Sequence, residues 1–270
     1  MVDPPRPCTR PPSPGRTPGK EPEMTDNILE TRDLSIAFGG LKAVDKVSFV
    51  AVPNGITTVI GPNGAGKTTL FNLISGGLRP SGGQVLLAGQ DVTGHAPTRL
   101  QQEGLARSFQ ITNLFFEMTV RENLRLAAQR LEPVSHGLRR IRRNGRAAEK
   151  VDELIARFDL GVKAFEVVGT LSHGEQRRLE IAMCLACEPK LLMLDEPTQG
   201  MSHSDTEETA DLIRSLTGDV SVLLIEHDIG LVMSLSDHVV VMHQGANLAE
   251  GTPAEVRANP AVQAAYFGQG

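Results

Sequence analysis

One segment of the sequence has the residue types and the spacing of a phosphate-binding loop. It matches the pattern G-x-x-x-x-G-K-[ST] at every fixed position and consists of Gly61, Pro62, Asn63, Gly64, Ala65, Gly66, Lys67 and Thr68. Glycines allow backbone N–H groups to close around a phosphate, and the start of the following helix adds a favourable field for an anion. Lys67 would reach the β- and γ-phosphates, and the Thr68 hydroxyl would bind Mg²⁺. The motif therefore predicts binding of a nucleoside triphosphate, but it does not define the reaction.

Two adjacent carboxylates follow an apolar run later in the chain. The run spans residues 191–194, and Asp195 and Glu196 come directly after it. In a protein with a phosphate-binding loop, the first carboxylate holds Mg²⁺ and the second can deprotonate the attacking water. The alternative is that both carboxylates only cap the next segment, residues 197–200. A Glu beside the Mg²⁺ ligand, and the lack of an Asn-Lys-x-Asp segment in the sequence, favour ATP hydrolysis over a kinase or a GTPase.

A third segment, residues 171–176, lies just upstream of the acid pair. Ser172 and Glu175 form an S-x-x-E capping box, so the segment could simply start a helix. The segment also resembles the L-S-G-G-Q signature of ABC ATPases, with His173 in place of one glycine. The resemblance implies that Ser172, Gly174, Glu175 and Gln176 hold the γ-phosphate of an ATP bound by a partner subunit. Because the sequence has one phosphate loop and one signature, the resemblance implies two ATPase subunits arranged head to tail.

The same resemblance assigns further residues around the nucleotide. Gln110 is similar to the Q-loop residue that senses Mg²⁺ and couples to a membrane subunit. His227 is similar to the switch histidine at the γ-phosphate, with a structural histidine as the alternative. Phe38 is similar to the aromatic residue that stacks on adenine, with a core phenylalanine as the alternative. Val44 and Thr69 complete the nucleotide contacts that the resemblance implies.

Short apolar strands would position these residues. Residues 56–60 lead into the phosphate loop, 191–194 lead into the acid pair, and 220–225 and 238–242 are two further strands. Strands that are apolar at every position are typical of a parallel sheet covered on both faces. Residues 28–38, 47–52 and 84–88 predict an antiparallel layer. Between residues 97 and 171 helical periodicity and charge dominate, notably at 121–126 and 147–158, which predicts an inserted helical lobe.

The resemblance covers residues 27–268 and implies an α/β fold. This fold is a RecA-like P-loop NTPase core with an antiparallel β subdomain and an inserted helical subdomain. We expect the ABC ATPase domain to span residues 24–270 and its helical subdomain to span 97–175. Residues 1–23 are rich in proline and have few side chains to bury, which predicts a disordered tail. Met24 opens the patterned sequence, so the tail could be a mis-assigned start.

The composition limits the classes of function. The chain has 270 residues, a formal net charge of -5, no Trp and one Tyr, which argues against a nucleic-acid-coating protein. The sequence has neither an apolar run near the ~18 residues of a membrane span nor the apolar segment of a secretory signal. A basic cluster lies at Arg139, Arg140, Arg142, Arg143 and Arg146. It could contact lipid head groups or nucleic acid, or it could be a solvated loop.

The three cysteines are Cys8, Cys184 and Cys187, a low and odd number that fits a reducing compartment. Cys184 and Cys187 form a C-x-x-C pair, which could indicate metal or redox chemistry. The sequence lacks a second pair or nearby histidines to complete a zinc site. The pair also lies in an apolar run at 181–187, which favours packing in a buried helix.

Several segments narrow the resemblance to the ATPases of branched-chain amino acid importers. They are residues 38–44, 113–115 with 118–124, and 177–182, and the urea and amide importers have similar segments. Residues 199–202 depart from the S-A-L-D of the usual D-loop, which leaves the communication between two sites open. The resemblance implies ATP and Mg²⁺ as cofactors and a position on the cytoplasmic face of the inner (plasma) membrane.

The implied partners are a second ATPase subunit, either a paralogue or an identical copy, and two integral membrane permease subunits. A periplasmic or extracellular solute-binding protein would act indirectly, and no nucleic acid would be bound. We therefore expect an ATP-hydrolysing subunit of an importer for branched-chain amino acids or related small polar solutes. The alternatives are a soluble ABC ATPase of translation or DNA repair, and a regulatory subunit that does not hydrolyse ATP. The sequence does not identify the solute.

Overall fold

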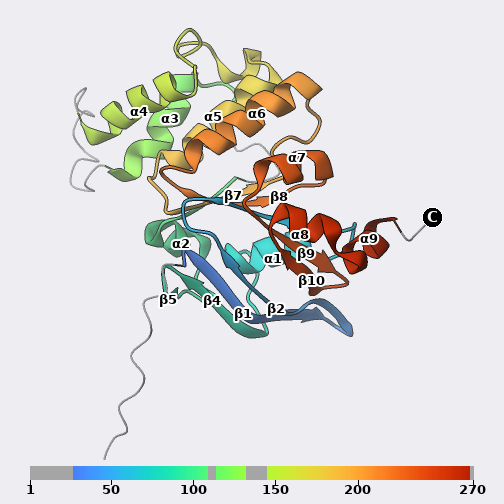
Figure 1. Cartoon of the computed structure of the whole chain (residues 1–270). Helices are drawn as coiled ribbons and strands as arrows, with labels where there is room; N and C mark the ends of the chain where they lie inside the picture. The colour runs from blue at the N-terminus through green and yellow to red at the C-terminus, as the bar shows by residue number, and fades with distance from the viewer. Residues whose placement is uncertain (1–26, 109–113, 132–144, 268–270) are drawn as a thin grey trace, which may run out of the picture.

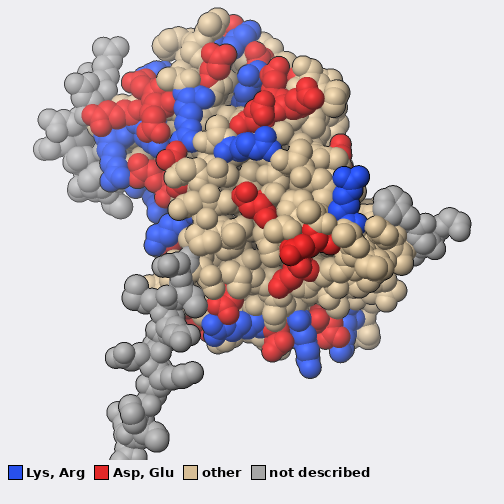
Figure 2. Space-filling view, in the orientation of Figure 1, with Lys and Arg blue, Asp and Glu red and all other residues tan. Residues whose placement is uncertain are grey.

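The computed structural model describes residues 27–108, 114–131 and 145–267, arranged in two sheets with helices around them (Figure 1). The predictions for the Pro-rich tail at 1–23, for Cys8, for Gln110 and for Arg139–Arg143 lie outside these residues. Within the described residues, no helix is long and apolar enough to cross a bilayer. Figure 2 shows acidic and basic side chains interspersed over the face it presents.

The larger sheet contains the strands that lead into the predicted site. Its order is β10-β9-β3-β8-β7-β6, and its neighbours are parallel except for β10 and β9. The strands are β3 (Ile56–Ile60), β6 (Leu105–Arg107), β7 (Leu191–Asp195), β8 (Ser221–Ile225), β9 (His238–His243) and β10 (Ala246–Gly251). The four predicted apolar strands are confirmed as β3, β7, β8 and β9. The sequence pattern missed β6, which is short, and β10, which has no fully buried residue and pairs at the edge.

Strand β7 shows why these strands are apolar at every position. Leu191 and Met193 belong to one core cluster, whereas Leu192 and Leu194 belong to another on the opposite face. All four residues are fully buried. Because both faces of the sheet are covered, alternation between polar and apolar residues is lost.

The smaller sheet is antiparallel, as predicted, and has the order β2-β1-β4-β5. Its strands are β1 (Leu29–Phe38), β2 (Leu41–Ala51), β4 (Gly82–Leu87) and β5 (Gln90–Asp91). Helix α1 (Lys67–Ile74) lies between the two sheets (Figure 1). Its Phe71 shares one core cluster with Phe49 of β2 and Leu223 of β8. The smaller sheet therefore holds α1, and the loop before it, against the larger sheet.

Of the remaining helices, the first packs on the same side of the larger sheet as α1, and the others lie on or beyond the opposite face. These helices are α2 (Pro97–Glu103), α3 (Val120–Ala128), α4 (Arg146–Arg157), α5 (His173–Leu185), α6 (His203–Leu216), α7 (Ile229–Leu235), α8 (Pro253–Ala258) and α9 (Pro260–Phe267), with short 3₁₀ turns at Gln129–Leu131 and Val168–Thr170. Helices α3, α4 and α5 gather at the top of Figure 1, apart from the antiparallel sheet. The predicted helical segments at 121–126 and 147–158 are confirmed as α3 and α4.

The helical insert was predicted to begin at residue 97, but the first elements after that point lie with the core. Strand β6 pairs in parallel with β7 of the larger sheet. Leu100 of α2 packs in the same cluster as α1. The periodicity of α2 is helical, and it gives no sign of which layer the helix covers. The described part of the helical layer therefore starts after β6.

The two described cysteines lie at the end of α5, where Cys187 is buried and Cys184 partly buried. The Cys187 thiol donates to the Ala127 carbonyl oxygen and accepts from Gln101 Nε2, both at 3.4 Å. Burial raises the pKa of Cys184 to about 12 and also raises the pKa of Cys187. These contacts support the packing interpretation of the C-x-x-C pair.

The packed cysteines predict slow alkylation. A thiol with a pKa near 12 is about 10⁻⁴ thiolate at pH 8, against tens of per cent for an exposed thiol. In a Cys8→Ser chain, iodoacetamide at pH 8 should leave both remaining thiols largely unmodified, as followed by mass spectrometry. The same chain in urea serves as the control and should react at both thiols. Rapid labelling of the folded chain would favour the redox or metal interpretation instead.

Candidate ATP-hydrolysing site

The phosphate-binding loop follows β3, whose residues are all buried, and leads directly into α1. Gly66 has a φ of 99°, and a Cβ there would lie 2.3 Å from the Ala43 carbonyl oxygen. Only glycine fits this position, because β2 passes against the loop. Among the described residues, no side chain caps the N-terminus of α1. The first N–H groups of this helix are therefore available to an anion.

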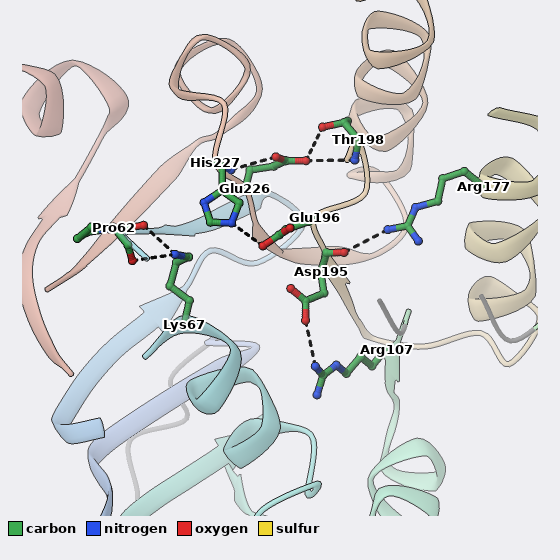
Figure 3. A network of polar contacts seen from close by, with 10 residues as sticks. Pro62, Lys67, Arg107, Arg177, Asp195, Glu196, Thr198, Glu226 and His227 are labelled. Atoms are coloured by element: carbon green, nitrogen blue, oxygen red, sulfur yellow. Dashed lines mark hydrogen bonds and ion pairs between the residues drawn. The ribbon is translucent and has the colours of Figure 1, made fainter. Parts of the chain in front are cut away.

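Lys67 begins α1 and is buried, with 6% of its surface exposed. Its Nζ donates hydrogen bonds to the carbonyl oxygens of Gly61, at 2.7 Å, and Pro62, at 3.2 Å (Figure 3). Burial lowers the pKa of Lys67, and the negative charges of Glu196 and Asp195 partly oppose this effect. The Lys67 ammonium thus binds to carbonyl groups of the phosphate loop and is attracted by the negative charges of Asp195 and Glu196.

Asp195 ends β7 and is 2% exposed. Its Oδ2 accepts a hydrogen bond from Arg107 Nη2 at 3.1 Å. Its Oδ1 is buried and has no hydrogen-bond partner among the described residues. Burial raises the pKa of Asp195, and the Arg107 charge acts in the opposite direction. A buried carboxylate oxygen without a protein donor suits a hydrated Mg²⁺ ion, so the residues present fit the predicted metal.

Glu196 and His227 meet at the edge where β7 and β8 end. Asp195 pairs with Ile225, so the residues after these two strands lie side by side. Glu196 Oε1 is 2.5 Å from His227 Nε2 (Figure 3). The Glu196 side chain is 10% exposed and the His227 side chain 43%. The structure therefore places a carboxylate next to an imidazole that is open on its other side.

The segment predicted to be the signature forms the capped N-terminus of α5. Ser172 Oγ accepts from the Glu175 N–H at 3.3 Å, and Glu175 Oε2 accepts from the Ser172 N–H at 2.8 Å. The capping box that the sequence predicted is therefore present. Gly174 lies in the first turn of α5, and Gln176 Nε2 donates to the Leu171 carbonyl oxygen at 3.2 Å. Capping alone would not require Gly174.

A polar pocket connects the signature segment to the acid pair. Its volume is about 190 Å³, and His173 and Gln176 line it together with Asp195 and Glu196. Arg177 of α5 also lines the pocket. The start of α5 and the end of β7 thus share one solvent-accessible space within a single chain.

Comparisons with known protein families agree with this geometry. Residues 44–199 match the family described as "ABC transporter". This chain belongs to the ABC transporter ATP-binding cassettes. The last residues of the cassette, 246–270, match a second family, described as "Branched-chain amino acid ATP-binding cassette transporter".

Individual relatives match most of the cassette over their own full length. It is 43% identical over 254 residues to a high-affinity branched-chain amino acid transport ATP-binding protein of Pseudomonas aeruginosa, covering 91% of the cassette and 100% of that protein. It is 41% identical over 254 residues, with the same coverage, to the corresponding protein of Escherichia coli K12. These relatives place the cassette in the branched-chain amino acid group.

A solved structure supports the fold. The crystal structure of the ADP conformation of an ATP-binding cassette of an ABC transporter has a TM-score of 0.81 and 32% identity, covering 91% of this chain and all of that one. The likeness confirms the RecA-like ABC ATPase fold. The cassette is an ATPase that binds nucleotide, and the alternative of a translation or repair ATPase is not favoured.

Two residues predicted to contact the nucleotide, Phe38 and Val44, lie on the β1–β2 hairpin of the cassette. Phe38 ends β1 and is 51% exposed, so it is not a core phenylalanine. Val44 is 1% exposed and packs in the core, which leaves its side chain little surface for a ligand. On α1, Thr68 is exposed and Thr69 is half-buried. Gln110 lies outside the described residues.

Sequence reasoning missed the residues that hold the acid pair in place. Arg177 Nε donates to the Pro197 carbonyl oxygen at 3.1 Å, and its Nη2 donates to the Asp195 carbonyl oxygen at 3.3 Å. Glu226 is 4% exposed and accepts from Thr198 N–H and Oγ1, at 3.2 and 2.6 Å. Each of these residues adjoins a predicted motif, but only the fold shows what its side chain contacts. Figure 3 shows this frame around the acid pair.

Proposed function

We propose that the cassette is the ATP-hydrolysing subunit of an importer for branched-chain amino acids or related small polar solutes. The observation that carries the mechanism is the contact between Glu196 and His227, next to Asp195 at the end of β7. The solute class rests on the relatives, which are named as branched-chain amino acid transport ATP-binding proteins.

The cassette's own residues would bind Mg·ATP from several elements. The loop at 61–66 and the open N-terminus of α1 surround the phosphates, and Lys67 turns from its two loop carbonyls to the β- and γ-phosphates. Thr68, Asp195 and Gln110 would hold Mg²⁺, and the ion would neutralise part of the negative charge of the phosphates. Phe38, exposed at the end of β1, is suited to stack on adenine. Thr69 would add a further nucleotide contact, whereas the buried side chain of Val44 leaves little surface for one.

Hydrolysis needs a base for the attacking water. Glu196 would accept a proton from that water while the new bond to the γ-phosphorus forms and the bond to the bridging oxygen of ADP breaks. His227 holds the Glu196 carboxylate through Nε2 and has its outer face free to reach the γ-phosphate. Gln110 would act at the same site as Glu196 and His227.

A second ATPase subunit would complete the site. Ser172, Gly174, Glu175 and Gln176 start α5 at the surface, and they would hold the γ-phosphate of the ATP bound by the partner, a paralogue or an identical copy. Residues 24–270 would be the ATPase domain with its helical insert within 97–175, and residues 1–23 a tail.

The ATPase pair would lie on the cytoplasmic face of the membrane against two permease subunits. A periplasmic or extracellular binding protein would deliver the solute, and ATP binding and hydrolysis would close and open the ATPase pair.

Uptake by reconstituted transporter tests this function. The cassette is assembled with its permease and ATPase partners in proteoliposomes that enclose ATP and Mg²⁺, with the binding protein outside. Radiolabelled leucine should accumulate only with ATP inside. Unlabelled isoleucine and valine should compete with leucine, whereas urea and acetamide should not.

Two controls define the result. Empty liposomes and liposomes that enclose ADP give the leak rate. Competition by urea or acetamide but not by isoleucine would move the solute class to the related importers. ATP turnover that never supports uptake of any of these solutes would contradict the importer proposal.

A further inference from the structure

Arg107 is a buried cation that the proposed mechanism does not use. It ends β6, and its side chain is 9% exposed. Its register is fixed, because Arg107 pairs with Met193 of β7 and the next N–H, that of Ser108, donates to the Met193 carbonyl oxygen at 2.9 Å. A guanidinium removed from water is costly unless its hydrogen bonds and charge are compensated. The groups that the Arg107 side chain contacts therefore indicate its role.

The Arg107 guanidinium contacts two separate elements of the site. Toward β7, Nη2 donates to Asp195 Oδ2 at 3.1 Å (Figure 3). Toward α1, Nη1 donates to Asn72 Oδ1 and to Ser75 Oγ, both at 2.7 Å. The guanidinium carbon also lies 5.7 Å from the centroid of the Phe71 ring. A planar group with a fixed fork of donors is suited to such a cross-link, whereas a lysine ammonium is not.

This cross-link restrains two of the three proposed metal ligands together. Asp195 ends β7, and Thr68 lies in the first turn of α1, the helix that carries Asn72 and has Ser75 as its C-cap. The arginine occupies Asp195 Oδ2 and leaves the buried Oδ1 without a protein partner among the described residues. One carboxylate oxygen is clamped, and the other remains for the ion.

We propose that Arg107 is a positioning residue for Mg²⁺: it orients Asp195 and fixes its distance from α1, so that Oδ1 and the Thr68 hydroxyl are preset for one ion. The inference rests on the proposed Mg·ATP site. Arg107 itself touches neither nucleotide nor metal. Residues that orient a metal ligand contribute to metal affinity because they remove the freedom that the ligand would otherwise lose on binding.

The test separates metal binding from nucleotide binding. The fluorescent analogue mant-ATP is titrated into the full-length chain with EDTA, and then Mg²⁺ is titrated at fixed mant-ATP. In Arg107→Met, the affinity measured in EDTA should stay within about twofold of the parent, and the half-saturating Mg²⁺ concentration should rise about 10- to 100-fold. Arg107→Lys should lie between, because it keeps the charge but cannot reach all three acceptors.

A matched control is available in the helical layer. Arg121 forms an ion pair with Asp152 at 2.6 Å and lies 6.0 Å from the centroid of the Phe165 ring, so it shares with Arg107 a carboxylate contact and a ring contact but lies away from the site. Arg121→Met should leave the Mg²⁺ titration unchanged. Circular dichroism and thermal melting check that each variant is folded. If Arg107→Met does not fold, Asn72→Ala, which removes one acceptor of Nη1, should raise the half-saturating Mg²⁺ concentration in the same direction.

The outcomes discriminate between the two proposals. If the parent responds to Mg²⁺ and Arg107→Met or its substitute responds equally, the positioning role is wrong and the proposed function stands. If the variant loses affinity in EDTA as much as in Mg²⁺, Arg107 supports the fold in general and the inference is also overturned. A parent that binds mant-ATP without any effect of Mg²⁺ would overturn the metal site and this inference together.

Discussion

Replacing Glu196 by Gln is expected to lower the ATP turnover rate by about 10²- to 10⁴-fold, the usual contribution of a positioned general base. The amide has the same shape as the carboxylate, so the neighbouring contacts to His227 and to the frame around residues 195–198 should be retained. An amide cannot take the proton from the attacking water. Binding of ATP should therefore persist, because Lys67 and the loop are unchanged.

Phosphate release measures the turnover rate of the variant, and a mant-ATP titration measures its affinity for nucleotide. With ATP and Mg²⁺, the variant should also accumulate as a closed pair of ATPase subunits, detected by size-exclusion chromatography with light scattering. Glu153→Gln is the matched control, because Glu153 is half exposed on α4 and, within the described residues, forms its ion pair with Lys150. It should hydrolyse ATP at the parent rate. Parent-like turnover in Glu196→Gln would remove Glu196 from the role of base.

The strands that end at the site residues could be predicted from the sequence, because a strand buried on both faces is apolar or β-branched at every position. Residues 56–60 and 191–194 are apolar or β-branched throughout, and each ends in a motif. β6 and β10 could not be predicted in the same way. β6 is only three residues long, and β10 has no fully buried residue. Such strands form because a neighbouring strand offers hydrogen bonds, and local sequence does not encode the neighbour.

Some residues of the candidate site could likewise be predicted from the sequence, and others could not. Lys67, Asp195 and Glu196 follow from spacing, since phosphate loops and strand-end acids are local patterns. Glu196 contacts His227 because β7 and β8 are parallel neighbours in the sheet. The positions of the two residues in the sequence suggested this contact, but only the order of the strands establishes it.

The partners of the acid pair lie beyond any local pattern. Arg107 is 88 residues from Asp195, and their contact exists only because β6 adds to the edge of the sheet beside β7. Arg177 reaches Asp195 and Pro197 from α5. A sequence pattern identifies the residues that do chemistry, whereas the residues that hold them come from packing.

Replacing Lys67 by Ala is expected to abolish ATP binding rather than only turnover, in contrast to Glu196→Gln. Charge-assisted hydrogen bonds to phosphate contribute about 1.5–3 kcal/mol each, so the loss of two should weaken binding by about 100-fold or more. The fold of the nucleotide-free chain should tolerate the change. Lys67 is 6% exposed, and the desolvation of its ammonium, which lowers its pKa, offsets much of its gain from the two loop carbonyls.

Thermal melting with and without Mg·ATP measures both effects in one experiment. A ligand at about 100 times its dissociation constant stabilises the native state by about 2.7 kcal/mol, so the parent should melt several degrees higher with ATP. Lys67→Ala should melt near the parent without ATP and show no shift with it. Lys190→Ala is the control, because Lys190 is exposed just before the start of β7, at the opposite end of that strand from Asp195. An ATP-induced shift of parental size in Lys67→Ala would mean that the loop binds phosphate through its backbone alone, and the assignment of Lys67 would then be wrong.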